Sequence, residues 1–113
     1  MLNQTRGLDK DGFIENLYSP KNIAPEFQGV VNAFIDSLLS ELPEQIYGIY
    51  LYGSVPRGTA IVGRSDLDVS IVLTTPIGPK ERRVFKHLSD TIPEAYPQVS
   101  KLDIDPGFLR DVL

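Results

Sequence analysis

The chain has 113 residues, 42% of them hydrophobic and 23% charged, which is typical of one compact globular domain and leaves too little chain for a second core. Its 15 acidic and 11 basic residues give a formal net charge of -4, so the overall positive field that drives non-specific nucleic-acid binding is absent and a long nucleic-acid substrate is disfavoured. The absence of cysteine excludes disulfides, thiolate metal sites and a cysteine nucleophile, so any metal would have to bind oxygen atoms or the single histidine.

The first 23 residues show no sustained hydrophobic period apart from a short apolar cluster within residues 13–18. We therefore expect a loosely packed lead-in segment over residues 1–23, followed by one domain over residues 24–113. The stretch from Met1 to Gly12 is polar and unlike a signal peptide, and no run approaches the roughly 20 apolar residues that span a bilayer. These features indicate a soluble, cytoplasmic protein with no membrane partner.

The next segment carries the pattern of an amphipathic helix. Apolar side chains recur at steps of three and one from Phe27 to Leu42, which is the spacing of one buried helix face. Pro25 suits the first turn of this helix, and Pro43 ends it.

Two predicted strands follow this helix. Residues 45–52 are rich in isoleucine and tyrosine and run into Gly53-Ser54, which predicts a strand and a glycine turn. Residues 54–63 contain one proline and two glycines, which predicts a loop or a short helical turn. A second strand is predicted over residues 66–74, where one face consists of Leu67, Val69, Ile71 and Leu73.

The last third of the chain predicts a helix and a third strand. The helix begins at Pro79, ends near Pro93 and has as its buried side Val84, Phe85, Leu88 and Ile92. The strand covers residues 98–105, ends at Pro106-Gly107 and has on one side Val99, Lys101, Asp103 and Asp105. The order helix, strand, strand, helix, strand predicts an α/β (α+β) fold in which helices pack against a small mixed β-sheet.

Two acids in the second predicted strand indicate a metal site. Asp66 and Asp68 are separated by one residue, so a strand places both carboxylates on the same face, about 7 Å apart along the chain. Their repulsion is relieved if a divalent cation lies between them, and oxygen ligands favour magnesium or manganese over zinc. A neighbouring third strand would add a third carboxylate, either Asp103 or Asp105.

A loop upstream of this pair is suited to binding phosphate. The glycine of Gly53-Ser54 lets backbone N–H groups approach an anion, and the serine adds a hydroxyl donor. Arg57 and Arg64 are candidate phosphate donors, with solvent exposure as the simpler interpretation, and Ser65 is a candidate phosphate ligand or a turn cap. Phosphates on the loop and metals on the acids indicate metal-assisted phosphoryl transfer.

The combination of Gly53-Ser54, Ser65-Asp66-Leu67-Asp68 and the later acidic strand Leu102-Asp103-Ile104 resembles the signature of the nucleotidyltransferase superfamily related to DNA polymerase beta. The resemblance covers residues 46–105. The variant Gly-Ser-Val-Pro-Arg-Gly-Thr with Gly-Arg-Ser-Asp-Leu-Asp is similar to aminoglycoside nucleotidyltransferases and to minimal nucleotidyltransferases that act with small helical partner proteins.

This resemblance implies an enzyme that transfers a nucleoside monophosphate from an NTP, expected to be ATP, to a hydroxyl group of a small molecule or a protein and releases pyrophosphate. It implies that Gly53-Ser54 holds the nucleotide phosphates, with Arg57 and Ser65 as further candidates. It also implies that Asp66 and Asp68 bind two magnesium ions, and that Asp103 is both a metal ligand and the general base.

Two alternatives to an active enzyme remain open. The chain could be a partner-dependent or non-catalytic, antitoxin-like module that binds a small helical protein. It could also be a truncated antibiotic-modifying enzyme, because larger relatives add a helical domain that shapes the nucleotide and acceptor sites.

The second predicted helix carries basic residues that have no role in the nucleotidyltransferase interpretation: Lys80, Arg82, Arg83 and Lys86. The simplest interpretation is a solvent-exposed helix face, and the alternative is that these residues bind an acidic partner. His87 has no acid at metal-ligand spacing and is assigned no role, whereas Tyr52 either packs on the sheet or lines a nucleotide base pocket.

Overall fold

The computed structural model describes residues 3–4, 9–10 and 23–112. The apolar cluster within residues 13–18 lies outside the described residues. Two short strands, β1 (Asn3–Gln4) and β2 (Asp9–Lys10), pair antiparallel near the beginning of the chain. The sequence analysis predicted no strand there, because a two-residue strand is too short to show a period-two pattern.

The first long helix, α1 (Pro25–Glu41), confirms the predicted amphipathic helix. Proline lies in its first turn, where a missing N–H costs nothing, and the helix is closed by the bond from the Leu42 N–H to the Leu38 carbonyl at 2.9 Å. Its buried face consists of Phe27, Val30, Val31, Phe34 and Leu38.

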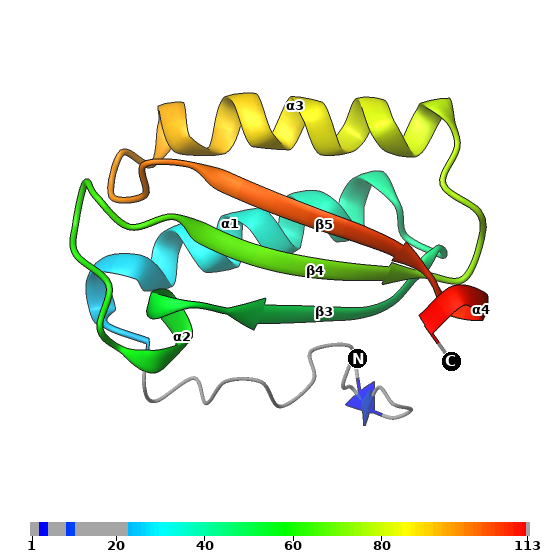
Figure 1. Ribbon diagram of the computed structural model, residues 1–113, viewed down its shortest axis with the longest axis horizontal. Helices are drawn as coiled ribbons and strands as arrows, with labels where there is room; N and C mark the ends of the chain where they lie inside the picture. The colour runs from blue at the N-terminus through cyan, green and yellow to red at the C-terminus, as the bar shows by residue number, and fades with distance from the viewer. Residues whose placement is uncertain (1–2, 5–8, 11–22, 113) are drawn as a thin grey trace.

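The main sheet has three strands in the order β3-β4-β5 (Figure 1). β3 (Ile46–Tyr52) pairs antiparallel with β4 (Leu67–Leu73), and β4 pairs parallel with β5 (Leu102–Phe108). This mixed sheet with packed helices confirms the predicted α+β fold class. A parallel pair needs a crossover connection, and α3 (Pro79–Ala95) supplies it between β4 and β5.

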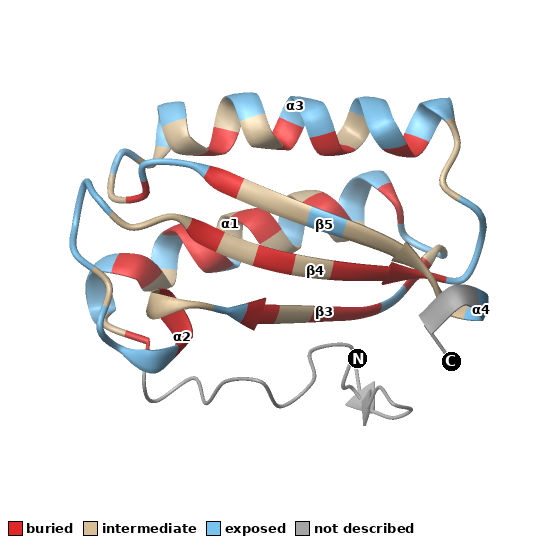
Figure 2. Ribbon diagram, viewed as in Figure 1, coloured by how far each residue is buried: buried red, intermediate tan, exposed pale blue. Residues whose placement is uncertain are grey.

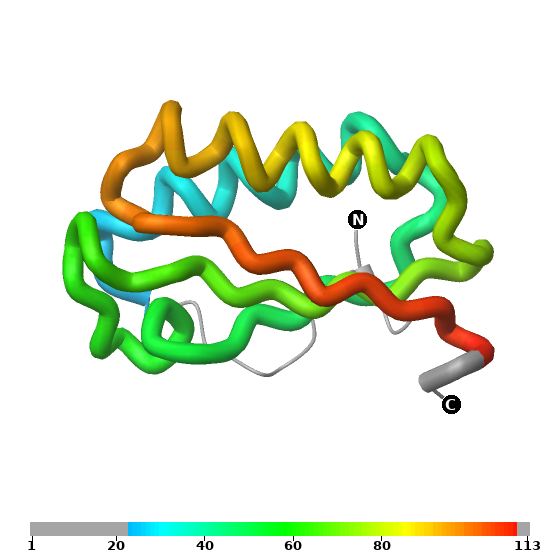
Figure 3. Tube along the Cα trace, turned by 45° about the horizontal axis from the view of Figure 1, so that its top comes forward, coloured from blue at the N-terminus to red at the C-terminus, as the bar shows by residue number. Residues whose placement is uncertain are grey.

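The helices form a second layer. α1 and α3 pack against each other on the same side of the sheet, as Figure 3 shows. The core lies between the two layers, where Leu67, Val69, Ile71 and Leu73 of the central strand β4 are buried (Figure 2). The other face of β4 carries the half-buried Asp68 and Ser70 and then the buried, apolar Val72.

The third strand differs from the prediction at both ends. It begins at Leu102, not at residue 98, because residues 97–100 form a turn in which the Val99 N–H donates to the Tyr96 carbonyl at 3.2 Å. Val99 is consequently buried, although the alternation placed it beside Lys101. The strand also continues through Pro106 to Phe108, since β5 is an edge strand, where the missing N–H of a proline need not break a ladder bond.

Two helices differ from the prediction. α3 continues past Pro93 to Ala95, because a proline in the last turn removes only one intrahelical bond. A last short helix, α4 (Leu109–Val112), was not predicted. The short helix α2 (Ser54–Arg57) confirms the helical turn, one of the two predictions for the residues after Ser54. Among the described residues, no helix is both long and apolar enough to cross a membrane.

A candidate active site at one end of the sheet

Three carboxylates meet on the face of the sheet that points away from the helices. Asp68 lies on β4, Asp66 directly precedes that strand, and Asp103 lies on β5 as the register partner of Asp68. One ligating oxygen from each of the three lies within 4.8 Å of the other two. The sheet therefore assembles the oxygen-rich cluster predicted from the spacing of Asp66 and Asp68.

Asp105 does not join this cluster. Its register partner on β4 is Ser70, one step further along the sheet than Asp68, and its side chain is exposed. Because Asp103 and Asp105 have the same parity on β5, alternation alone could not separate them. The parallel register does so, and Asp103 supplies the third carboxylate.

The surroundings of Asp68 raise the pKa of its carboxyl group. Partial burial raises the pKa of Asp68, and the negative charges of Asp103 and Asp66 raise it further. A hydrogen bond with Asp103 also favours the protonated form, whereas the positive charge of Lys101 opposes the shift. A divalent cation among these oxygens would reverse this penalty, so the donor set fits a hard metal ion such as magnesium.

Lys101 is a site residue that the sequence analysis did not single out. Its Nζ lies 3.4 Å from Oδ1 of Asp103, and the two side chains are 62% and 43% exposed. The signal was present, because the alternation of residues 98–105 placed Lys101 on the same side as Asp103. A metal ion bound to Asp103 would therefore either share this carboxylate with Lys101 or displace the lysine from it.

Gly53 lies against the acid cluster. It follows β3 with φ +84° and ψ -153°, a conformation essentially limited to glycine, and a Cβ added there would lie 2.5 Å from Oδ2 of Asp68. The backbone at position 53 thus approaches the carboxylate more closely than any other residue type would allow. The sequence analysis expected a glycine here so that backbone N–H groups could approach a phosphate, and the structure adds a second reason, the space that Asp68 occupies.

The short helix α2 fixes this glycine turn. Arg57 donates from Nε to the Gly53 carbonyl at 3.0 Å, and Thr59 N–H donates to the Ser54 carbonyl at 3.1 Å. The Ser54 hydroxyl makes no hydrogen bond within the described part of the chain, so its donor is available to a ligand. Arg57 is exposed and keeps its terminal Nη donors.

Ser65 closes the turn that leads into β4. Its Oγ accepts a hydrogen bond from the Ile61 N–H at 2.8 Å, and its own N–H donates to the Ile61 carbonyl at 3.0 Å. The turn-cap interpretation is therefore observed, and a hydroxyl that accepts one hydrogen bond still has a proton to donate. Arg64 is exposed on the same turn.

Tyr52 borders the site on the β3 side. It is the register partner of Asp68 and is 41% exposed, so its ring is not packed into the core. Burial raises the pKa of its hydroxyl, as do the charges of Asp105, Asp68 and Asp103. His87 and the basic residues 80–86 lie on α3, on the helical side of the sheet, and take no part in this cluster.

Comparisons with known proteins agree with this geometry. No curated protein and no solved structure matches the chain. The family model described as "Nucleotidyltransferase domain" matches residues 31–104, which is more than half of the chain and includes every candidate residue from Gly53 to Asp103. The chain belongs to the nucleotidyltransferase domain family.

Proposed function

We propose that this domain transfers a nucleoside monophosphate from an NTP to a hydroxyl acceptor and releases pyrophosphate, with magnesium as the metal. One observation carries the proposal: three carboxylates gather within 4.8 Å beside a glycine turn whose backbone reaches Asp68. Nucleotidyl transfer needs this pairing, because phosphates require nearby donors and their charge requires nearby cations.

We propose that Asp66, Asp68 and Asp103 hold the metal. The three oxygens form a hard, negatively charged donor set of the kind that magnesium prefers. Burial and the neighbouring negative charges of Asp103 and Asp66 raise the pKa of Asp68, and a cation would favour its charged form. When bound, magnesium supplies positive charge that stabilises the attacking and leaving oxygens.

The protein's own residues then hold the nucleotide and accept the proton. The Gly53 backbone and the Ser54 hydroxyl hold the phosphates, with the Nη groups of Arg57 and the Ser65 hydroxyl as further donors. The acceptor oxygen attacks the α-phosphorus, the bond to the bridging oxygen breaks, and pyrophosphate leaves. The proton of the acceptor hydroxyl passes to the Asp103 carboxylate.

ATP is the proposed nucleotide, and the acceptor is the hydroxyl of a small molecule or a protein. The alternative of an antitoxin-like module bound to a small helical protein stays a prediction from the resemblance. A module of that kind without catalysis would not need the complete acid cluster, which favours the enzyme. Dependence on a partner is compatible with either.

Calorimetric titration with a non-hydrolysable ATP analogue tests the site. We expect binding in magnesium and its loss in EDTA, and loss in Asp68→Asn even with magnesium present. Asp105→Asn is the matched control, because it removes an acid from the same sheet face outside the cluster, and it should bind like the wild type. Equal binding by the wild type and Asp68→Asn would contradict the metal assignment.

A further inference from the structure

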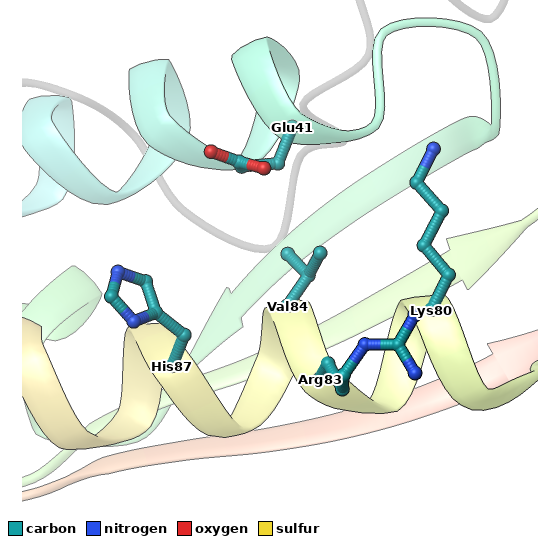
Figure 4. A pocket seen from close by; sticks show the side chains of 5 residues that line it. All are labelled: Glu41, Lys80, Arg83, Val84 and His87. Carbon is teal, nitrogen blue, oxygen red and sulfur yellow. The ribbon is translucent and has the colours of Figure 1, made fainter.

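A groove of about 400 Å³ lies between the last turn of α1 and the first half of α3 (Figure 4). Its lining residues are Glu41 from α1 and Lys80, Arg83, Val84 and His87 from α3. Four of these five side chains are charged or polar, but their aliphatic carbons and Val84 supply most of the exposed lining. The groove therefore combines apolar walls with the charged groups at the ends of the side chains.

The α3 side of the groove is one continuous helix face. Its residues 80, 83, 84 and 87 have the spacing i, i+3, i+4 and i+7, so their side chains lie in one stripe. Lys80 and Arg83 form no ion pair with any acid in the part of the chain that the structure describes, and both are exposed. Lys86, on another face of the same helix, is instead paired with Asp90 at 3.0 Å.

Glu81, the acid nearest in sequence, interacts electrostatically with Lys80 but forms no ion pair with the stripe among the described residues. Glu81 is 8% exposed and turns inward, where Oε1 accepts from the Gly78 N–H at 2.8 Å and Oε2 accepts from Gln45 Nε2 at 3.0 Å. Its carboxylate therefore caps the helix and ties it to the start of β3. The stripe keeps two exposed positive charges in a chain whose formal net charge is -4.

We propose that this groove binds an acidic segment of a partner protein, whose carboxylates pair with Lys80 and Arg83. The half-buried Val84 on the same helix face adds an apolar contact surface, which suits a peptide with alternating acidic and apolar side chains. Glu41 on the opposite wall disfavours a polyphosphate chain such as RNA, whose charge is uniformly negative, but can accept hydrogen bonds from peptide N–H groups.

The groove is separate from the candidate active site. Lys80 and Arg83 lie on the helical layer, whereas Asp68 alternates with buried residues of β4 and faces the other side of the sheet. A partner bound to the groove would leave the acid cluster uncovered. The inference therefore does not depend on the proposed function and can be tested without nucleotide.

Fluorescence anisotropy with the full chain tests the groove. The probe is a labelled peptide of alternating glutamate and leucine, at about 0.15 M salt. We expect the double substitution Lys80→Glu with Arg83→Glu to weaken binding by about tenfold or more, as expected for lost charge-assisted contacts. Glu41→Gln should tighten binding, because it removes the repulsive charge.

Arg82→Glu is the matched control for Arg83→Glu alone, since both reverse one arginine charge on the same helix but Arg82 does not line the groove. It should change binding by less than about twofold. Circular dichroism would establish that each variant is folded, and Asp68→Asn should bind the peptide like the wild type.

Four results would overturn the proposal. A loss of peptide affinity in Arg82→Glu equal to that in Arg83→Glu would show only diffuse electrostatic attraction. Equal binding of a glutamine-leucine peptide would remove the role of the carboxylates. Stronger binding of a single-stranded oligonucleotide than of the peptide would assign the surface to nucleic acid. No binding of the acidic peptide to the wild type would show that acidic peptides are not ligands of this groove.

Discussion

The backbone of Gly53 and the side chain of Asp68 lie so close that a Cβ on residue 53 would be 2.5 Å from Oδ2 of Asp68. The contact joins the end of β3 to the central strand β4, and with them the proposed phosphate loop and the metal ligands. Residue 53 is constrained twice, by its φ of +84° and by the space that Asp68 occupies.

Gly53→Ala should therefore abolish magnesium-dependent binding of the ATP analogue. The side chain strains the backbone by roughly 1–3 kcal/mol and displaces the Asp68 carboxylate from its neighbours. Gly63→Ala is the control, because Gly63 also has a positive φ of 81° but a Cβ there would meet nothing within 4 Å. Calorimetry should show binding retained in Gly63→Ala, and a similar loss in both variants would contradict a specific role for the Gly53–Asp68 contact.

Asp68→Asn should stabilise the metal-free protein at neutral pH. The folded pKa of Asp68 is raised above the ordinary value of 3.8, so its favourable contribution exists below that value and is lost as the pH rises through the folded pKa. Removing the charge should then add up to about 1 kcal/mol at pH 7, and the gain should vanish in more acidic solution. Thermal melting in EDTA across this pH range measures the effect.

Magnesium should reverse the order of stability, so that the wild type melts at a higher temperature than Asp68→Asn. An ion that binds only the folded wild type at ten times its Kd stabilises it by about 1.4 kcal/mol, whereas Asp68→Asn should gain little. A melting temperature of the wild type that is insensitive to magnesium would argue against a metal site at the cluster.

Lys101→Gln should tighten binding of magnesium alone. The lysine ammonium lies 3.4 Å from Oδ1 of Asp103 and competes for the same charge. Because the pair is largely exposed, we expect a gain of no more than about fivefold, corresponding to about 1 kcal/mol. Lys86→Gln removes a paired lysine from α3 and should leave magnesium affinity unchanged, as measured by calorimetry without nucleotide.

Glu81→Gln should destabilise the fold in a pH-dependent way. Hydrogen bonds from its own N–H and from the Gly78 N–H lower the pKa of Glu81 below its ordinary value of 4.5. The stabilisation is therefore present above that value and lost as the pH falls through the folded pKa. The melting temperature of Glu81→Gln should lie below that of the wild type at pH 7 and approach it in acid, whereas the exposed Glu44→Gln should show no such difference.

The sequence by itself determined the two long helices, the three strands of the main sheet and half of the site. Local periodicity is sufficient for α1 and β4, because each buries one regular face, and the parity of Asp66 and Asp68 places both carboxylates on one side of a strand. The glycine motif and the acid pair also identified the family, which the match over residues 31–104 confirms.

Only the tertiary structure decided which acid completes the cluster. Asp103 and Asp105 share one face of β5, and the register that sets Asp103 beside Asp68 depends on how a distant strand pairs with β4. The same dependence explains the other departures. Pro106 is accommodated because β5 lies at the sheet edge. These relationships join residues through space, and no local pattern in the chain encodes them.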